Sequence, residues 1–134
     1  MCKKVFVSYA RPDQDSAQRL VGDLRGAGFE VWFDQDSLLP GQSWKVEITR
    51  AIRQSDCFVA LLSTQSVDRR GYVQKELVQA LDVLDKCPLN QIFLIPTRID
   101  NCEIIHPRLG DLQWIDLFPD WNRAVNRIIM AITS

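Results

Sequence analysis

Histidine and cysteine are scarce in this chain of 134 residues, and neither is spaced for metal binding. The only histidine, His106, precedes Pro107 in a late segment, and no two cysteines form a CxxC pair. A zinc site would need ligands from scattered segments, and a Ser-His-Asp or Cys-His mechanism would depend on His106 alone. We therefore expect no bound metal and no catalytic histidine. The cysteines are Cys2, Cys57, Cys87 and Cys102.

An excess of basic charge and long apolar runs are also missing. The 16 basic and 17 acidic residues give a net charge of −1, so the chain has no excess of positive charge to attract the phosphate backbone of a nucleic acid. No apolar run reaches membrane-spanning length, and the N-terminal one is too short for a signal peptide. With cysteines that show no disulfide pattern, these features favour a cytoplasmic protein that binds neither nucleic acid nor membrane.

The common phosphate-binding loops do not occur. There is no GxGxxG after a predicted strand and no GxxxxGK[ST], which excludes a Rossmann dinucleotide fingerprint and a P-loop. The first predicted strand, VFVSY, also lacks the acidic residues that a receiver-type domain would carry at its end. The function must therefore depend on other residues.

What the sequence does contain is a regular alternation of strand-like and helix-like segments over residues 1–134, which we interpret as one domain. Hydrophobic residues make up 46% and charged residues 25%, as in an ordinary folded domain. Short apolar runs predict strands at 5–9, 29–33, 57–63, 92–96 and 112–117. Helical spacing predicts buried faces of Ala17, Leu20, Val21, Leu24 and Ala27; of Trp44, Ile48, Ala51 and Ile52; of Val73, Leu77, Ala80, Leu81 and Leu84; and of Trp121, Ala124, Val125, Ile128, Ile129 and Ile132.

This alternation predicts an α/β fold, a flavodoxin-like three-layer sandwich. Each crossover between parallel strands lays a helix on the sheet, so helices should cover both faces of a five-stranded parallel sheet. The order 2-1-3-4-5 suits this length, with the 57–63 strand in the centre. Ligands in such sheets bind beyond the carboxyl ends of the strands at the switch in strand order, here near residues 8–13 and 63–72.

Several residues at this switch are candidates for ligand binding. Tyr9 could stack on a base and Arg11 could hold a phosphate, whereas Pro12 and Asp13 could simply begin a helix. Ser63, after the third strand, could contact a ligand or only form a turn.

Glu76 is the carboxylate that the helical pattern places near this switch. It lies on the flank of the stripe that packs on the sheet, one turn after Tyr72, while Lys75 and Asp82 fall on the solvated side. A carboxylate there could point into a cleft. It could equally be a solvated surface glutamate.

The segment from Asp34 to Ser43 places two leucines before a Pro-Gly pair. Leu38 and Leu39 lie in a loop that the sheet is not expected to cover fully. Exposed apolar side chains on a loop favour a contact surface. A surface of this kind could face a ligand, another protein or the domain's own core.

In this order, the segments resemble the Toll/interleukin-1 receptor (TIR) domain over nearly the whole chain. VFVSYARPD resembles the family's first box, and GFEVWFDQDSLLPGQSW its second strand and BB loop. SDCFVALLSTQS resembles the third strand, and YVQKELVQAL the helix that carries the family's catalytic glutamate. The loop sequence DSLLPGQSW is more similar to bacterial defence effectors than to animal receptors.

The resemblance implies cleavage of NAD+ at the nicotinamide–ribose bond, with NAD+ as substrate and no resident cofactor. Position by position, it makes Glu76 the catalytic carboxylate. Tyr72 stands where many enzymatic members have tryptophan, which leaves the substrate preference open. The substrate-binding residues that it implies are Tyr9, Arg11, Asp34, Leu39, Trp44, Ser63 and Tyr72.

The resemblance also implies self-assembly with other TIR domains through the loop. The implied assembly residues are Leu38, Leu39, Pro40, Gly41 and Trp44. Activity would then depend on a homo-oligomer or filament, and a sensor domain in a longer protein would control it. A non-catalytic TIR–TIR adaptor is the alternative, although such adaptors lack the glutamate, and a nucleotide-binding sensor without chemistry is a third possibility.

Overall fold

The computed structural model describes residues 3–33, 39–64, 75–87, 91–104 and 107–134, apart from the side chains of residues 44–45 and 75–77. Five strands alternate with helices along the chain. The strands are β1 (Lys4–Ser8), β2 (Glu30–Trp32), β3 (Cys57–Leu62), β4 (Leu94–Arg98) and β5 (Ile115–Asp116). The helices are η1 (Arg11–Asp13), α1 (Gln14–Gly26), α2 (Trp44–Gln54), α3 (Lys75–Asp85), α4 (Pro107–Gly110) and α5 (Trp121–Thr133).

The strands form one parallel sheet in the order β2-β1-β3-β4-β5, as the sequence predicts. In the central pairing, Val5 to Ser8 of β1 lie opposite Cys57 to Ala60 of β3. All six residues of β3 are buried, which fits its place in the middle of the sheet. The strand order therefore switches between β1 and β3, and both strands end at the same edge.

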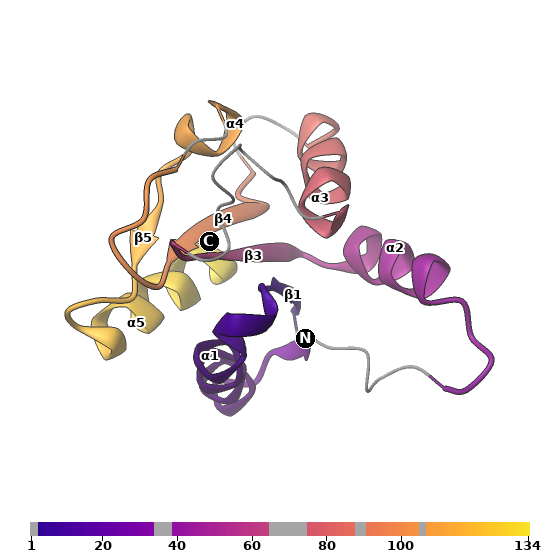
Figure 1. The fold of residues 1–134 in the computed structure, drawn as a ribbon, viewed down its shortest axis with the longest axis horizontal. Helices are drawn as coiled ribbons and strands as arrows, with labels where there is room; N and C mark the ends of the chain where they lie inside the picture. Colours follow the sequence, from indigo (N-terminus) through magenta and orange to yellow (C-terminus); the bar gives the residue numbers. More distant parts are fainter. Residues whose placement is uncertain (1–2, 34–38, 65–74, 88–90, 105–106) are drawn as a thin grey trace.

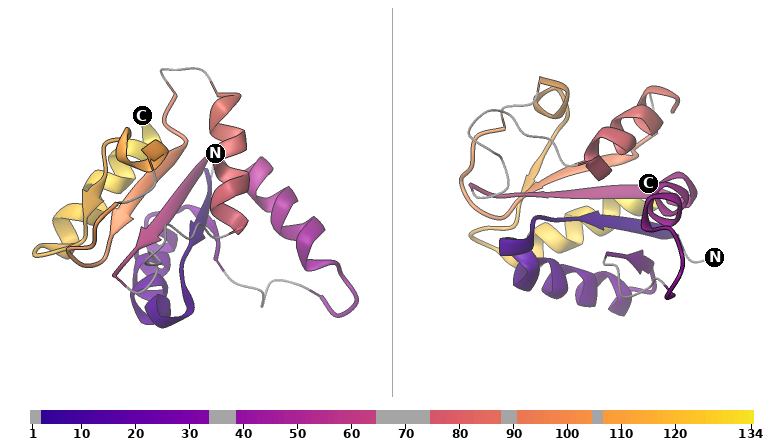
Figure 2. Two further views of the ribbon diagram at one scale, coloured as in Figure 1. Left: turned by 45° about the horizontal axis from the view of Figure 1, so that its top comes forward. Right: turned by 45° about the vertical axis from the view of Figure 1, so that its right-hand side comes forward.

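Helices cover both faces of the sheet (Figure 1). One core cluster joins the sheet to α1 and α5, and a second joins it to α2, α3 and α4. Figure 2 shows the same three layers from two further directions. The architecture is the predicted three-layer sandwich, with a hydrophobic core on each side of the sheet.

The described helices bury most of the faces that their spacing predicts, but Ala27 is exposed because α1 ends at Gly26. Helix α1 buries Ala17, Leu20, Val21 and Leu24, and α5 buries Ala124, Val125, Ile128 and Ile132. On the other face, Ile48, Ile52, Ala80 and Leu81 are buried in the second cluster. No helix of the described ranges is long and apolar enough to span a membrane.

The ends of the fourth strand differ from the prediction. The apolar run at 92–96 predicts a strand that stops at Pro96, but β4 begins at Leu94 and continues to Arg98. Strand β5 pairs only with Thr97 and Arg98 of β4. Pro96 therefore has no paired strand on the β5 side of β4. A proline is tolerated there because its missing N–H costs no ladder hydrogen bond. The predicted helix start at Pro12 and Asp13 is the 3-10 helix η1, which leads directly into α1, and the short helix α4 was not predicted.

Candidate functional site

The carboxyl ends of β1, β3 and β4 meet at the switch in strand order, where Asp13 and Ser63 are in contact. The Ser63 hydroxyl donates a 2.7 Å hydrogen bond to the Asp13 carboxylate. Both residues are buried, although each follows a different strand along the chain. The contact therefore connects the segment after β1 to the end of β3.

Burial raises the pKa of Asp13 above its ordinary value of 3.8, and the nearby charge of Asp100 raises it further. The hydrogen bond from Ser63 acts in the opposite direction, because it stabilises the charged form. The net effect is a carboxylate that is less stable in the folded protein than in water.

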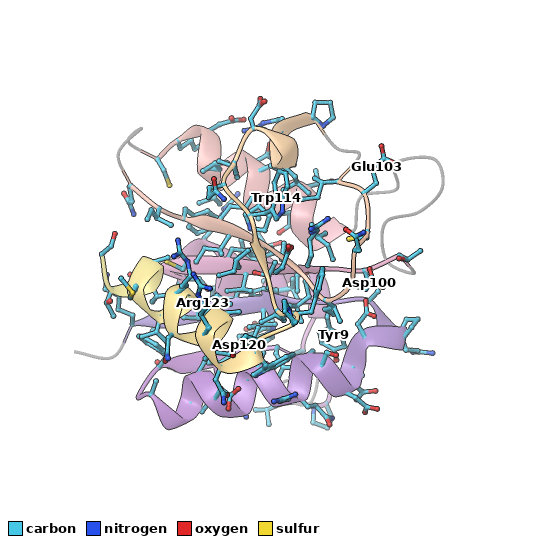
Figure 3. The ribbon with its side chains drawn as sticks, turned by 90° about the vertical axis from the view of Figure 1, so that its left-hand side faces the viewer. Tyr9, Asp100, Glu103, Trp114, Asp120 and Arg123 are labelled. Atoms are coloured by element: carbon cyan, nitrogen blue, oxygen red, sulfur yellow. The ribbon has the colours of Figure 1, made fainter. Side chains whose placement is uncertain are left out.

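Asp100 connects β3 and β4 at the same edge. It follows β4, and its carboxylate accepts hydrogen bonds from the Thr64 backbone N–H at 3.0 and 3.2 Å and from the Thr64 hydroxyl at 3.0 Å. Figure 3 shows Asp100 and Tyr9 at the same end of the sheet. The two carboxylates and their serine and threonine partners give this edge a fixed polar floor.

Tyr9 forms an aromatic wall beside this floor. Its ring is tilted against that of Phe33, with centroids 5.8 Å apart, and the Arg25 guanidinium lies 5.7 Å from the Phe33 ring. Tyr9 is half-buried against the core cluster under α1 and α5. An aromatic ring held this way can still offer a surface to a ligand that stacks.

The other residues predicted around Tyr9 have different environments. Arg11 is exposed in η1. Ser63 is only 2% exposed and its hydroxyl donates a hydrogen bond to Asp13, so its contact with a ligand stays a prediction. Asp13 itself was interpreted from the sequence only as a helix start. It is the N-cap residue of α1, but its side chain makes no cap hydrogen bond and turns to Ser63 instead.

Glu76 is the second residue of α3. Because β3 and β4 are parallel, the helix between them runs back across the sheet, and its first turn lies at the carboxyl edge. Its backbone is thus placed at the edge that carries Tyr9 and Ser63. Its side chain lies outside the described residues, as do Asp34, Leu38, Tyr72 and the side chain of Trp44. The predicted cleft between Glu76, Tyr9, Ser63 and Tyr72 therefore stays a prediction.

The described part of the loop presents Leu39 on a defined turn. The Gln42 backbone N–H donates to the Leu39 carbonyl at 3.1 Å, and the Leu39 N–H donates to the Gln42 side chain at 2.7 Å. Gly41 has φ +91°, which the third position of such a Pro-Gly turn requires. Ser43 then caps α2 by accepting from the Val46 N–H. Leu39 is 68% exposed, so in the monomer it covers little of its own core.

Among the described residues, no three His, Cys, Asp or Glu side chains lie together in a way that could hold a metal ion. The sequence did not single out Asp100 at all. The signal that could have found Asp13 and Asp100 is their position in the segments that follow β1 and β4, at the carboxyl edge of the parallel sheet.

The fold is that of a TIR domain. Residues 5–129 match the family model described as TIR domain, so the chain belongs to this family. It is 38% identical over 110 residues to the NAD(+) hydrolase PdTIR of Paracoccus denitrificans, covering 80% of this chain and 36% of that protein.

Two further relatives show the same domain within longer chains. The chain is 30% identical to uncharacterized protein y4cD of Sinorhizobium fredii, over 93% of this chain and 19% of that protein. A metazoan TIR-STING receptor from C. gigas, solved in complex with 2',3'-cGAMP, superposes with a TM-score of 0.79 at 25% identity, over 97% of this chain and 39% of that one. The chain thus spans about a fifth to two-fifths of these relatives.

Proposed function

We propose that this TIR domain is an NAD+ nucleosidase that cleaves the nicotinamide–ribose bond. The observation that supports the proposal is the backbone position of Glu76 near the start of α3, at the edge of the sheet where β1 and β3 end. The 38% identity to an NAD(+) hydrolase supports the same activity. Neither argument requires a bound metal or a resident cofactor, because NAD+ is the substrate.

The chemistry needs a carboxylate at the ribose. When the bond between the ribose carbon and the nicotinamide nitrogen breaks, its electron pair leaves with nicotinamide and positive charge develops on the sugar. The Glu76 carboxylate would stabilise that charge, or capture it covalently, and could accept a hydrogen bond from a ribose hydroxyl. Water then adds to the sugar and loses a proton, which gives ADP-ribose. Attack by another atom of the same molecule would give a cyclic isomer.

We further propose that the domain acts when assembled with other copies. Leu39 is held exposed on a structured turn, and such an apolar side chain favours a contact with another protein. A partner sensor domain would promote assembly, and the setting we propose is bacterial anti-phage defence. The matched relatives are much longer than this chain, which leaves room for such a part in a multidomain protein.

The experiment compares NAD+ breakdown by the parent protein and by Glu76→Gln, with nicotinamide, ADP-ribose and cyclic isomers separated by chromatography. The substitution keeps the shape and removes the charge, so we expect turnover to be abolished and the melting temperature to stay nearly unchanged. Glu30→Gln is the matched control, because Glu30 is exposed at the amino end of β2. Parent-level turnover by Glu76→Gln would disprove the carboxylate mechanism.

A non-catalytic adaptor is the second candidate, and the exposed Leu39 favours it equally. The two functions differ in one result. An adaptor would self-associate at high concentration without releasing nicotinamide, whereas the enzyme would release it under the same conditions.

A further inference from the structure

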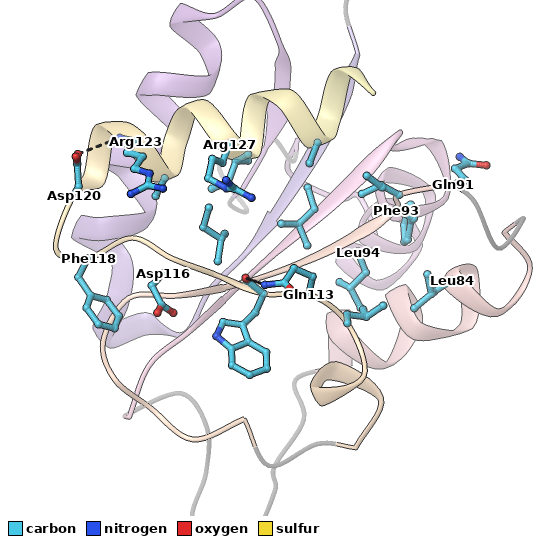
Figure 4. A pocket seen from close by; sticks show the side chains of 18 of the residues that line it. Leu84, Gln91, Phe93, Leu94, Gln113, Asp116, Phe118, Asp120, Arg123 and Arg127 are labelled. Carbon is cyan, nitrogen blue, oxygen red and sulfur yellow. Dashed lines mark hydrogen bonds between the residues drawn. The ribbon is translucent and has the colours of Figure 1, made fainter.

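A cavity of about 690 Å³ lies on the flank of the sheet, between α5, β4 and the segment that leads into β5. Figure 4 shows it from close by. It is separate from the site described above, because it follows the lateral edge of the sheet and includes none of the residues predicted to bind substrate. Its volume is within the range of small-molecule sites.

The cavity exists because β5 covers only part of β4. In a parallel sheet, successive residues of a strand form backbone hydrogen bonds alternately with the strand on one side and the strand on the other. The Phe93 carbonyl accepts from Phe58 of β3, whereas the Arg98 carbonyl accepts from Leu117, just after β5. By this alternation, Pro96 faces the uncovered side, where it has no N–H to donate. A further strand would therefore pair poorly on this edge. The space beside Leu94 suits a small ligand better than an added peptide strand.

The floor of the cavity is apolar and partly aromatic. Phe93, Leu94, Ile95 and Ile128 line it and are buried. Trp114 lines it as well and is 39% exposed. This floor would bury the flat or apolar body of a ligand and exclude water from it.

The carboxylates and the guanidinium groups around the cavity differ in whether they have partners. Asp116 is held by Arg98 through two hydrogen bonds of 2.6 and 2.8 Å, and Asp120 caps α5 by accepting from the Arg123 backbone N–H at 3.1 Å. Both carboxylates that line the cavity are therefore satisfied. The guanidinium groups of Arg123 and Arg127 have no hydrogen-bond or ion-pair partner among the described residues.

The position of these two arginines on the helix is unfavourable for their charges. They lie one turn apart on α5, which contains no acidic residue, and like charges at this spacing repel. Arg123 is also in the first turn, where the helix dipole disfavours a cation. In Figure 4 both side chains lie on the side of the helix that faces Gln113 and Asp116. An anion bound between them would relieve each of these penalties.

We propose that this cavity binds a small amphipathic anion. Its aromatic or apolar body would lie on the floor at Phe93 and Trp114, and its phosphate or carboxylate group would lie between Arg123 and Arg127. A doubly hydrogen-bonded anion is what paired guanidinium groups recognise best. The inference is independent of the proposed NAD+ cleavage, because it uses none of the same residues.

The test is a titration of the ¹⁵N-labelled protein with phenyl phosphate, observed by NMR at the tryptophan indole N–H signals. The Trp114 signal, identified by its loss in Trp114→Phe, should shift with saturation. The Trp121 signal is the internal reference, because its indole N–H donates to Asp23 at 2.7 Å on the α1 side. Inorganic phosphate and phenol, titrated separately, should each bind at least tenfold more weakly than phenyl phosphate, because inorganic phosphate lacks the aromatic body and phenol lacks the anionic group.

Arg127→Gln should weaken phenyl phosphate binding about tenfold, the effect of losing one charged hydrogen bond. Arg53→Gln, at an exposed position of α2, is the charge-matched control and should bind like the parent. Equal binding of phenyl phosphate and inorganic phosphate, or equal losses in the two variants, would overturn the proposal. It would also be overturned if the Trp114 signal shifted only on concentration of the protein, with a rise in sedimentation coefficient, because the occupant would then be a second copy.

Discussion

Ser63 and Asp13 are joined by a 2.7 Å hydrogen bond between residues that are 50 positions apart in the sequence. The bond lies at the switch in strand order and connects the end of β3 to the start of α1. It fixes the polar floor on which the proposed site depends. Its removal should therefore affect stability and substrate binding together.

Ser63→Ala should lower the free energy of unfolding by about 2 kcal/mol, because it leaves a buried carboxylate without its donor. Denaturant unfolding at neutral pH measures this. Ser16→Ala is the control: Ser16 is half-buried in α1, and alanine is favoured in helices, so little or no loss is expected. Equal stabilities of parent and Ser63→Ala would show that solvent replaces the bond at no cost.

Asp13 should make stability fall as pH rises above about 4. The pKa of Asp13 in the folded protein is raised above 3.8. At pH values between 3.8 and this folded pKa, the folded state therefore binds more protons than the unfolded state. The stabilisation from the protonated form is thus complete at low pH and is lost as pH rises through the folded pKa. Asp13→Asn should remove this slope. Unfolding free energies of both proteins from pH 3.5 to 7 measure it, and parallel curves would contradict it.

Leu39→Asp should spare the fold and remove assembly. The side chain is 68% exposed, so the melting temperature should change by less than that of a core variant. If Leu39 contacts another copy, a buried charge there would cost a few kcal/mol, and the rise of NAD+ cleavage with protein concentration should disappear. Met130→Asp, at a similar exposure of 67% on α5, is the matched control. A lower melting temperature for Leu39→Asp alone would mean that the loop covers its own core.

Cys57 and Cys102 should resist alkylation in the folded protein. Both are buried, and desolvation raises the pKa of each thiol to about 11. At pH 8 roughly one such thiol in a thousand is a thiolate, the form that reacts. Of the three cysteines in the described ranges, the half-buried Cys87 should be modified first. Mass spectrometry of peptides after iodoacetamide treatment checks the order, and 6 M guanidinium chloride should abolish the difference. Early labelling of Cys102 would instead indicate that the segment after β4 opens.

The sequence by itself determined the order of the elements, the parallel sheet, and the buried faces of α1 and α5. These features depend on local periodicity and on the rule that parallel crossovers place helices on the sheet, so neighbouring residues carry the information. The position of Glu76 near the switch edge follows from the same rules, and its side-chain role stays a prediction.

Only the tertiary structure decided that Asp13 bonds to Ser63 and that Asp100 bonds to Thr64. Each pair joins residues from separate loops, and nothing in their local sequence distinguishes a helix start from a buried partner. The cavity beside Pro96 likewise depends on where β5 stops pairing with β4 and on the two arginines of α5 that face it. Local pattern cannot specify these contacts, because their free energies arise from burial and charge that exist only after the layers have packed.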